Sequence, residues 1–233
     1  KRKKVAKSKM PKDTLGIYNL QRKSLTKIPN VKGHKLPAKW AGFVAYQLEE
    51  VKSDKKTEGK KAKKVSAKNG YHVVIRNLKT NRQDTLKYIT SYSFAEEAQR
   101  LVYVTTGEEG WAAPGIYWIN LENNRSNTIF STEKAKYSKL TISASGERVG
   151  FIADLDTTKA QVRPNALYSW KEGMNRAEKL VDAASAPQGY RVSADGNISY
   201  SEDESKMYFG LATPPIVKDT ALIAEEIVNV EVW

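Results

Sequence analysis

The feature that most constrains this chain is a hairpin-like stretch that recurs along it. Residues 135–154 (AKYSKLTISASGERVGFIAD) hold two apolar runs separated by a polar turn at residues 144–147. Two such runs joined by a Ser/Gly turn predict an antiparallel hairpin. Weaker versions recur, each preceded by a run rich in Ile, Tyr and Trp, at residues 15–20 (LGIYNL), 71–78 (YHVVIRNL), 115–121 (GIYWINL) and 166–170 (ALYSW). The chain is therefore expected to fold as a series of similar β-units.

The spacing of these units indicates how they assemble. The equivalent positions Tyr18, Ile75, Tyr117 and Tyr168 lie 57, 42 and 51 residues apart, and the longest step contains a Lys-rich insertion. Four-stranded units that repeat every 40–50 residues are typical of propeller blades, and one blade cannot bury both sheet faces alone. We predict an all-β fold over residues 13–233: a β-propeller of four-stranded antiparallel blades, with about four blades present in an incomplete ring. A β-sandwich is the alternative.

The end of the repeat series bears on whether the ring is complete. Residues 227–233 (IVNVEVW) resemble the first strand of a further unit. The chain is therefore expected to be either a small closed ring or, as the strand-like end favours, part of a larger protein.

The positive charge of the chain is concentrated in two segments. Residues 1–12 hold seven Lys or Arg and no acid, and residues 51–64 hold seven Lys and two acids, in a chain of net charge +13. Lys runs without apolar residues cannot offset their ordering entropy, so we predict a mobile leader (residues 1–12) and a flexible insertion (residues 51–68). A nucleic-acid surface would mix Arg and aromatic residues with the Lys, so no nucleic-acid partner is expected. Binding to an anionic surface through these segments remains an alternative hypothesis.

Composition excludes several kinds of site. The chain has no cysteine, and its only histidines are His34 and His72. Disulfides and thiolate metal sites are therefore excluded, and no apolar run approaches the length of about 18 residues that a membrane span requires. Asp154, Asp156 and Asp203 do not form a calcium-loop pattern. We expect no metal and no cofactor, and we expect the five tryptophans to pack mostly between blades.

Two hairpin motifs carry a resemblance to known propellers. Residues 143–151 (SASGERVGF) and 198–210 (ISYSEDESKMYFG) resemble the hairpins of TolB-like, WD40-like and dipeptidyl-peptidase-type blades. The succession LGIYNL, KLPAKWAGFVAYQLE, the Lys-rich insertion, VIRNL and ITSYSFAEEAQRLVYVT resembles the N-terminal propeller of bacterial prolyl oligopeptidase family serine peptidases over nearly the whole chain. Residues 144–146 depart from the pattern because they lack the usual Asp before Gly.

The resemblance implies a non-catalytic role for this chain within a larger hydrolase. The family's propeller covers an α/β-hydrolase domain and admits peptide-sized substrates, and a periplasmic or cell-envelope location is suspected. The sequence contains no G-x-S-x-G segment, so no catalytic triad is assigned to it. The partners implied are a peptide substrate and a hydrolase domain not in this chain. The alternative is a stand-alone TolB-like propeller that mediates protein–protein interaction.

Two acidic pairs are candidate substrate contacts. Glu96-Glu97 resembles the paired acids that hold a substrate's amino terminus in dipeptidyl peptidases, and Glu108-Glu109 lies beside Trp111. Adjacent carboxylates can clamp an ammonium group through charge-assisted hydrogen bonds. Both pairs fall in expected turns or loops, where solvated acids are also common.

Overall fold

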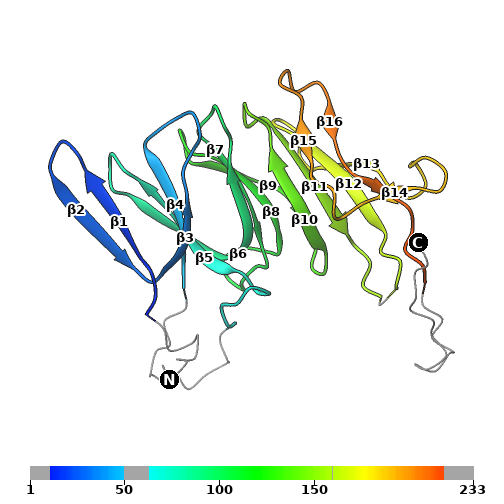
Figure 1. Cartoon of the computed structure of the whole chain (residues 1–233), viewed down its shortest axis with the longest axis horizontal. Helices are drawn as coiled ribbons and strands as arrows, with labels where there is room; N and C mark the ends of the chain where they lie inside the picture. The colour runs from blue at the N-terminus through cyan, green and yellow to red at the C-terminus, as the bar shows by residue number, and fades with distance from the viewer. Residues whose placement is uncertain (1–10, 50–62, 159, 218–233) are drawn as a thin grey trace, which may run out of the picture.

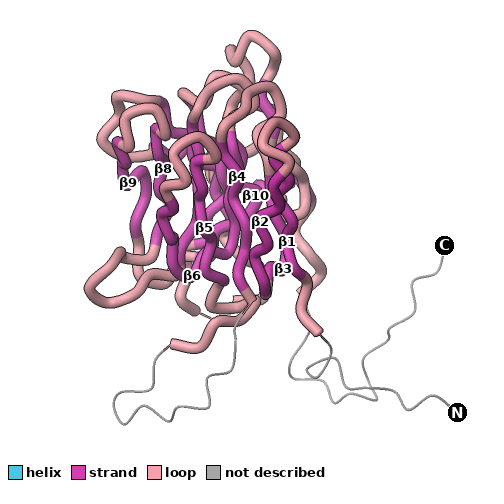
Figure 2. The backbone as a smooth tube through the Cα atoms, turned by 90° about the vertical axis from the view of Figure 1, so that its left-hand side faces the viewer, coloured by secondary structure: helices cyan, strands magenta, loops and turns pink. Residues whose placement is uncertain are grey.

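The protein is built from β-strands. The computed structural model describes residues 11–49, 63–158 and 160–217, and in these ranges every regular element is a strand that pairs antiparallel with its neighbours (Figure 2). The predicted all-β fold class is thus confirmed. No helix long and apolar enough to cross a membrane occurs in the described ranges. The strands are β1 (Thr14–Asn19), β2 (Ser24–Pro29), β3 (Val31–Lys35), β4 (Phe43–Leu48), β5 (Tyr71–Asn77), β6 (Gln83–Phe94), β7 (Arg100–Thr105), β8 (Gly115–Asn120), β9 (Arg125–Ser131), β10 (Lys136–Ile142), β11 (Arg148–Asp154), β12 (Asn165–Lys171), β13 (Glu178–Val181), β14 (Arg191–Val192), β15 (Ser199–Tyr200), β16 (Met207–Tyr208) and β17 (Leu211–Ala212).

Strand β6 joins two blades. The strands β3 to β9 form one seven-stranded sheet in chain order. Residues 83–89 of β6 pair with β5, whereas residues 89–94 pair with β7, and the register shifts between Ile89 and Ser91. Because the two halves of β6 have different partners, the sheet divides there into the first blade (β3, β4, β5 and the first half of β6) and the second blade (the second half of β6, β7, β8 and β9).

The remaining strands continue the series. The third blade is the four-stranded sheet β10-β11-β12-β13. The hairpin β1-β2 precedes the first blade, and the short pairs β14-β17 and β15-β16 follow the third. These units lie side by side in chain order and form an arc (Figure 1). The structure thus has the stacked four-stranded blades of an incomplete β-propeller.

The grouping of strands into blades differs from the sequence expectation. The repeat had placed the hairpin of residues 140–153 with residues 115–130 in one unit. The structure instead places β10 and β11 with β12 and β13, and β8 and β9 with β7. The expected grouping was wrong by two strands, because a repeat in sequence fixes the length of a unit but not where the unit starts.

The blades bury both faces of their sheets. Along β8, Ile116 and Trp118 belong to the core between the second and third blades, the second interface. Tyr117 and Ile119, on the opposite face of β8, pack into the core between the first and second blades, the first interface. A sandwich sheet buries one face, so this alternation supports stacked blades over a sandwich.

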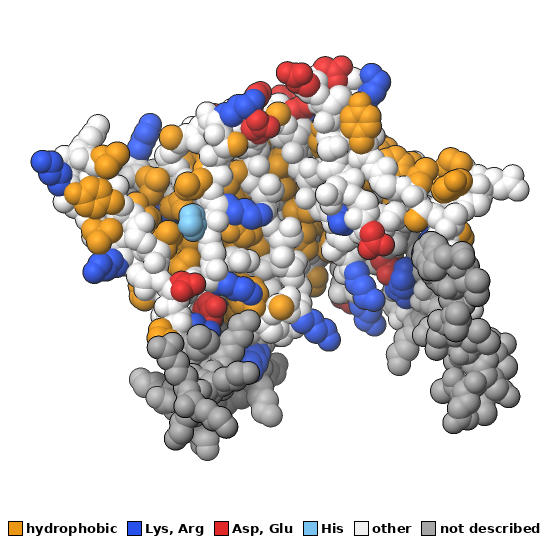
Figure 3. Space-filling model, in the orientation of Figure 1, with side chains coloured by type: hydrophobic (Ala, Val, Ile, Leu, Met, Phe, Trp, Pro, Cys, Tyr) orange, Lys and Arg blue, Asp and Glu red, His pale blue; other side chains and the backbone are white. Residues whose placement is uncertain are grey.

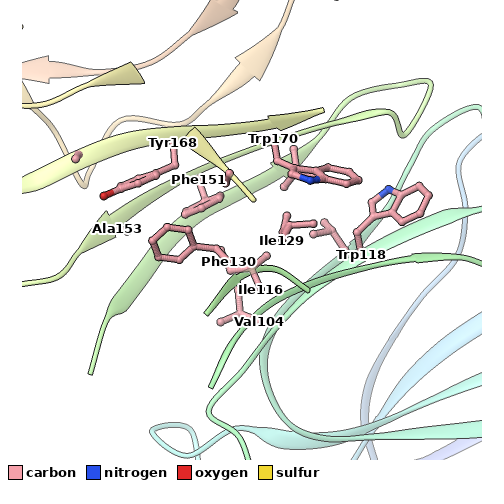
Figure 4. Packing of buried hydrophobic residues seen from close by; sticks show 13 residues of the cluster. Val104, Ile116, Trp118, Ile129, Phe130, Phe151, Ala153, Tyr168 and Trp170 are labelled. Atoms are coloured by element: carbon pink, nitrogen blue, oxygen red, sulfur yellow. The ribbon is translucent and has the colours of Figure 1, made fainter. Parts of the chain in front are cut away.

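The described tryptophans pack in the cores between blades, as predicted: Trp118 and Trp170 in the second interface, and Trp40 and Trp111 against the first. Trp118 and Trp170 are fully buried, and their ring centroids lie 5.4 Å apart (Figure 4). Phe130 of the second blade contacts Phe151 and Tyr168 of the third, at 5.4 and 4.9 Å between centroids. Tightly interlocked aromatic rings of this size make a large contribution to stability.

Several predictions fall outside the described residues. The leader and the Lys-rich insertion lie there except for residues 11–12 and 63–68, as do Trp233 and the strand expected at residues 227–233. Of the insertion, Lys63 is described: its Nζ donates to the carbonyl oxygens of Thr106 (2.9 Å) and Gly107 (2.7 Å), and Tyr88 Oη donates to the Lys63 carbonyl oxygen. These contacts hold this part of the insertion against the first blade and the loop after β7.

Candidate functional site

The first acidic pair holds an ammonium group that belongs to the protein itself. Glu96 and Glu97 form the turn between β6 and β7, and both carboxylates bind Lys39 Nζ, at 3.0 and 2.8 Å. Hydrogen bonds from Lys39 to Glu97 and Glu96 raise the pKa of Lys39, which therefore stays charged. The three side chains are about half exposed. The geometry shows that the pair can bind an ammonium, and an incoming amine would have to displace Lys39.

Contacts between successive turns create a groove beside this pair. The Lys39 N–H donates to the Glu96 carbonyl oxygen (3.1 Å), and the Glu97 N–H donates to that of Ala144 in the β10-β11 turn (2.9 Å). The turn groove that results has a volume of about 980 Å³ and is open to solvent. Acidic side chains gather at this end of the blades (Figure 3).

The β10-β11 turn continues this series toward the β15-β16 turn. The Ser145 N–H and Oγ donate to the two carboxylate oxygens of Glu204, at 2.7 and 2.8 Å. Partial burial alone would raise the pKa of Glu204, but hydrogen bonds from Ser145 and Ser143 and the charge of Arg148 together lower the pKa. Ser145 thus connects the β10-β11 turn to the β15-β16 turn. Gly146 has φ +78°, and a Cβ there would lie 2.5 Å from Arg100, so the turn requires glycine.

The second acidic pair lies in the loop between β7 and β8. Glu108 binds Lys87 Nζ at 2.7 Å, and its backbone N–H and carbonyl oxygen both pair with Ala112. Glu109 is exposed. The loop borders an open cavity of about 840 Å³ that Lys63 and Trp111 also line. Burial lowers the pKa of Lys63, although Glu108 opposes this shift.

The structure does not bring the two acidic pairs together. Glu96-Glu97 precedes β7 and Glu108-Glu109 follows it. Strand residues rise about 3.3 Å each, so the six residues of β7 separate the pairs by about 20 Å. Each pair would therefore contact a different part of any peptide. Their role in substrate binding remains a prediction.

The other titratable residues named from the sequence have internal partners. Asp154 and Asp156 both accept from Arg163, at 2.7 and 3.1 Å. Asp203 accepts hydrogen bonds from the hydroxyl groups of Ser201 and Ser205 within its own turn. These carboxylates close and cap loops.

The two histidines occupy strands of the first blade. His34 is an exposed residue of β3. His72, in β5, packs against Tyr88 with ring centroids 5.0 Å apart, and burial lowers its pKa, so its neutral form predominates at pH 7. In the described ranges, no group of three or more His, Asp or Glu could hold a metal ion.

Sequence reasoning missed two residues of the turn groove. Lys39 lies in an unpatterned link between β3 and β4, and its partners are 57 and 58 residues away. Glu204 lies 59 residues from Ser145. A single sequence carries no signal for pairs so distant.

Comparisons with known proteins give structural likenesses only. No family model matches the sequence, and no curated protein matches it. A chain of Pyrococcus horikoshii acylaminoacyl peptidase matches 83% of this chain over 31% of its own length, with 15% identity and a TM-score of 0.41. The β-propeller domain of the trilobed protease from Pyrococcus furiosus matches 78% of this chain over 71% of its own, with 13% identity and a TM-score of 0.32.

A third match is to a protein of another kind. Kuenenia stuttgartiensis hydrazine synthase matches 88% of this chain over 52% of its own, with 12% identity and a TM-score of 0.40. The chain spans about a third of the length of the acylaminoacyl peptidase that it matches. Such distant likenesses do not assign an activity to this chain.

Proposed function

We propose that this chain is the non-catalytic propeller part of a prolyl oligopeptidase family serine peptidase. In this proposal an α/β-hydrolase domain outside this chain performs the hydrolysis, and the blades restrict which peptides reach it. The observation that carries the proposal is the ordered succession of blade motifs in a sequence without a G-x-S-x-G segment. The described turns that carry the SASGERVGF and ISYSEDESKMYFG motifs contact each other along one edge of the blades, which supports neighbouring blades stacked in the same orientation.

The test is to expose the chain to a serine-directed probe and to peptide substrates. A fluorophosphonate should label no serine, and aminoacyl and dipeptidyl chromogenic substrates should not be turned over. Covalent labelling of a serine in this chain, with turnover that its alanine variant loses, would overturn the proposal. The second test is to sequence the open reading frame that contains this chain. A G-x-S-x-G segment elsewhere in that frame supports the proposal, and an open reading frame without a hydrolase domain favours a stand-alone interaction module.

Location follows from the same proposal and has its own test. We propose a periplasmic or cell-envelope location, which would suit basic segments that meet acidic envelope surfaces. Fractionation of cells that express the intact protein should recover it with periplasmic or envelope markers. Recovery with cytoplasmic markers alone would contradict this location and leave the propeller assignment unaffected.

A further inference from the structure

A cavity lies at the first interface. This cavity of about 480 Å³ lies between strands β4, β5 and β6 on one side and strands β7, β8 and β9 on the other. Ile75 and Leu86 line it from the first blade, and Tyr103, Tyr117 and Ile119 line it from the second. The loop residue Trp111 lies along it as well. A volume of this size falls in the range of small-molecule binding sites.

The rim of this cavity is polar and carries both charges. Arg82 pairs with Asp84 at 3.2 Å, and Glu122 pairs with Arg100 at 2.8 Å. Arg82, Asp84 and Glu122 line the cavity. Because these charges already have partners, the rim carries no excess charge of either sign. The site is therefore suited to a neutral group with an apolar body.

One hydroxyl group on the wall of the cavity, that of Tyr103, has no partner among the described residues. Tyr103 is 5% exposed, and its hydroxyl forms no hydrogen bond with any residue that the structure describes. Burial raises the pKa of Tyr103, so the hydroxyl stays protonated and able to donate. The Tyr103 hydroxyl oxygen is not fully enclosed, so solvent in the open cavity reaches it in the free protein, and a ligand oxygen could take the place of that solvent as its acceptor. The Tyr117 hydroxyl, by contrast, already donates to the Ala113 carbonyl oxygen at 2.9 Å.

The cavity also offers aromatic surface. The Tyr103 and Tyr117 rings are stacked, with centroids 5.3 Å apart and planes 11° from parallel. Trp111, whose loop is fixed by backbone bonds between Glu108 and Ala112, adds a third ring. Aromatic pairs gain stability beyond the area they bury, so this lining favours a ring over an aliphatic chain.

We propose that the cavity of the first interface binds a neutral aromatic side chain that carries an acceptor oxygen, a tyrosine presented by an extended peptide. The ring packs against Tyr103, Tyr117 and Trp111, and its oxygen accepts from the Tyr103 hydroxyl. This site is separate from both acidic pairs, and it does not depend on the presence of a hydrolase domain. It would give the arc a preference for peptides with a tyrosine.

The test is a titration of the whole chain with three neutral peptides, Ac-Gly-Gly-X-Gly-Gly-NH₂, in which X is Tyr, Phe or Ala. Their neutrality keeps the Lys-rich segments from contributing. The Tyr peptide should bind most tightly, about fivefold tighter than the Phe peptide, because one hydrogen bond is worth about 1 kcal/mol. The Ala peptide should bind at least about tenfold more weakly than the Tyr peptide, because it has no ring to bury. Equal binding of Tyr and Ala peptides, or no binding of either, would overturn the proposal.

Variants locate the site. Tyr103→Phe should remove the preference for Tyr over Phe while Phe-peptide binding persists, and Ile119→Phe, which fills the cavity, should weaken both. The matched control is Tyr46→Phe: the Tyr46 hydroxyl bonds Gln83 Oε1 at 2.9 Å outside the cavity, so peptide binding should be unchanged. A Tyr preference that survives Tyr103→Phe would refute the assigned donor. None of these outcomes bears on serine labelling, so the proposed function is tested separately.

Discussion

The two interfaces between blades differ in how completely side chains fill them. In the second, Trp118 and Trp170 are fully buried, and Phe130 meets the rings of the third blade. In the first, Tyr103 and Tyr117 of the second blade stack on each other, and a cavity of about 480 Å³ remains between them and the first blade. Protein interiors are normally close-packed. The same repeat therefore yields one interface that serves stability and one that has room for a ligand.

Strand β8 allows the two interfaces to be compared directly, because it contributes side chains to both. Ile116 and Trp118 face the filled one, and Tyr117 and Ile119 face the hollow one. Alternate residues of one strand thus experience two packing environments. Substitutions along β8 separate packing from backbone effects, since the backbone is common to both.

The largest expected effect is the loss of a tryptophan from the filled interface. Trp118→Ala should lower the free energy of unfolding by about 3–5 kcal/mol, because it leaves a cavity and removes the hydrogen bond from Nε1 to the Gly146 carbonyl oxygen. Trp111→Ala, at the hollow interface, should cost less than half as much, because part of this ring already borders open space. Denaturant unfolding measures both. Equal losses would show that the interfaces do not differ in packing.

Substitutions that enlarge a side chain should also destabilise the filled interface more than the hollow one. Ile116→Phe should destabilise by about 1–3 kcal/mol, because the filled interface has no room for a larger ring. Ile119→Phe, three residues along the same strand, should be close to neutral because it faces the cavity. Thermal unfolding of the pair tests this, and a costly Ile119→Phe would contradict the cavity.

The hydroxyl groups of two tyrosines give a smaller contrast. Tyr46→Phe should cost about 1 kcal/mol, since it removes the hydrogen bond from the buried Tyr46 hydroxyl to Gln83. Tyr103→Phe should leave the free energy of unfolding unchanged, because its hydroxyl has no partner in the described part of the chain. A loss at Tyr103 as large as that at Tyr46 would reveal a partner for its hydroxyl.

The smallest effect concerns the turn that extends the series beyond the third blade. The folded pKa of Glu204 is lowered below its ordinary value of 4.5. Its contribution is therefore present above about pH 4.5 and is lost as the pH falls through the folded pKa. Because Glu204 is partly exposed, Glu204→Gln should remove only about 0.5 kcal/mol at pH 7. When the free energy of unfolding is measured against pH, it should fall less steeply at acidic pH for the variant than for the unaltered protein. An equally steep fall would contradict the contribution of the hydrogen bonds from Ser145 to the Glu204 carboxylate.

The fold class could be predicted from the sequence because the repeat is local and regular. Runs such as GIYWINL alternate, end at Asn or Gly turns, and recur at nearly constant spacing. The positive φ of Asn81 and Asn124 in the turns after β5 and β8 shows why Asn recurs there. Which strand begins each blade was not predictable from the sequence, because the boundary between the first two blades is marked only by the pairing of β6 with two different neighbours.

The sites were less predictable because they depend on contacts between blades. The sequence identified Glu96-Glu97 as able to bind an ammonium group, but it could not show that Lys39 supplies one. The Tyr103 cavity depends on how far two blades diverge, and neither blade alone encodes that separation. The tryptophans showed that aromatic packing would fill interfaces, but not which interface would stay open.

The most direct test of the stacked-blade account is a set of nuclear Overhauser contacts from the side chains of β8. The account predicts contacts from Trp118 to Trp170, whose ring centroids lie 5.4 Å apart, and separate contacts from Ile119 to the side chains of β5 and β6. Observing both sets would place β8 between two neighbouring sheets. If only one face of β8 contacted a neighbouring sheet, the fold would be a two-layer sandwich and the account of filled and hollow interfaces would be wrong.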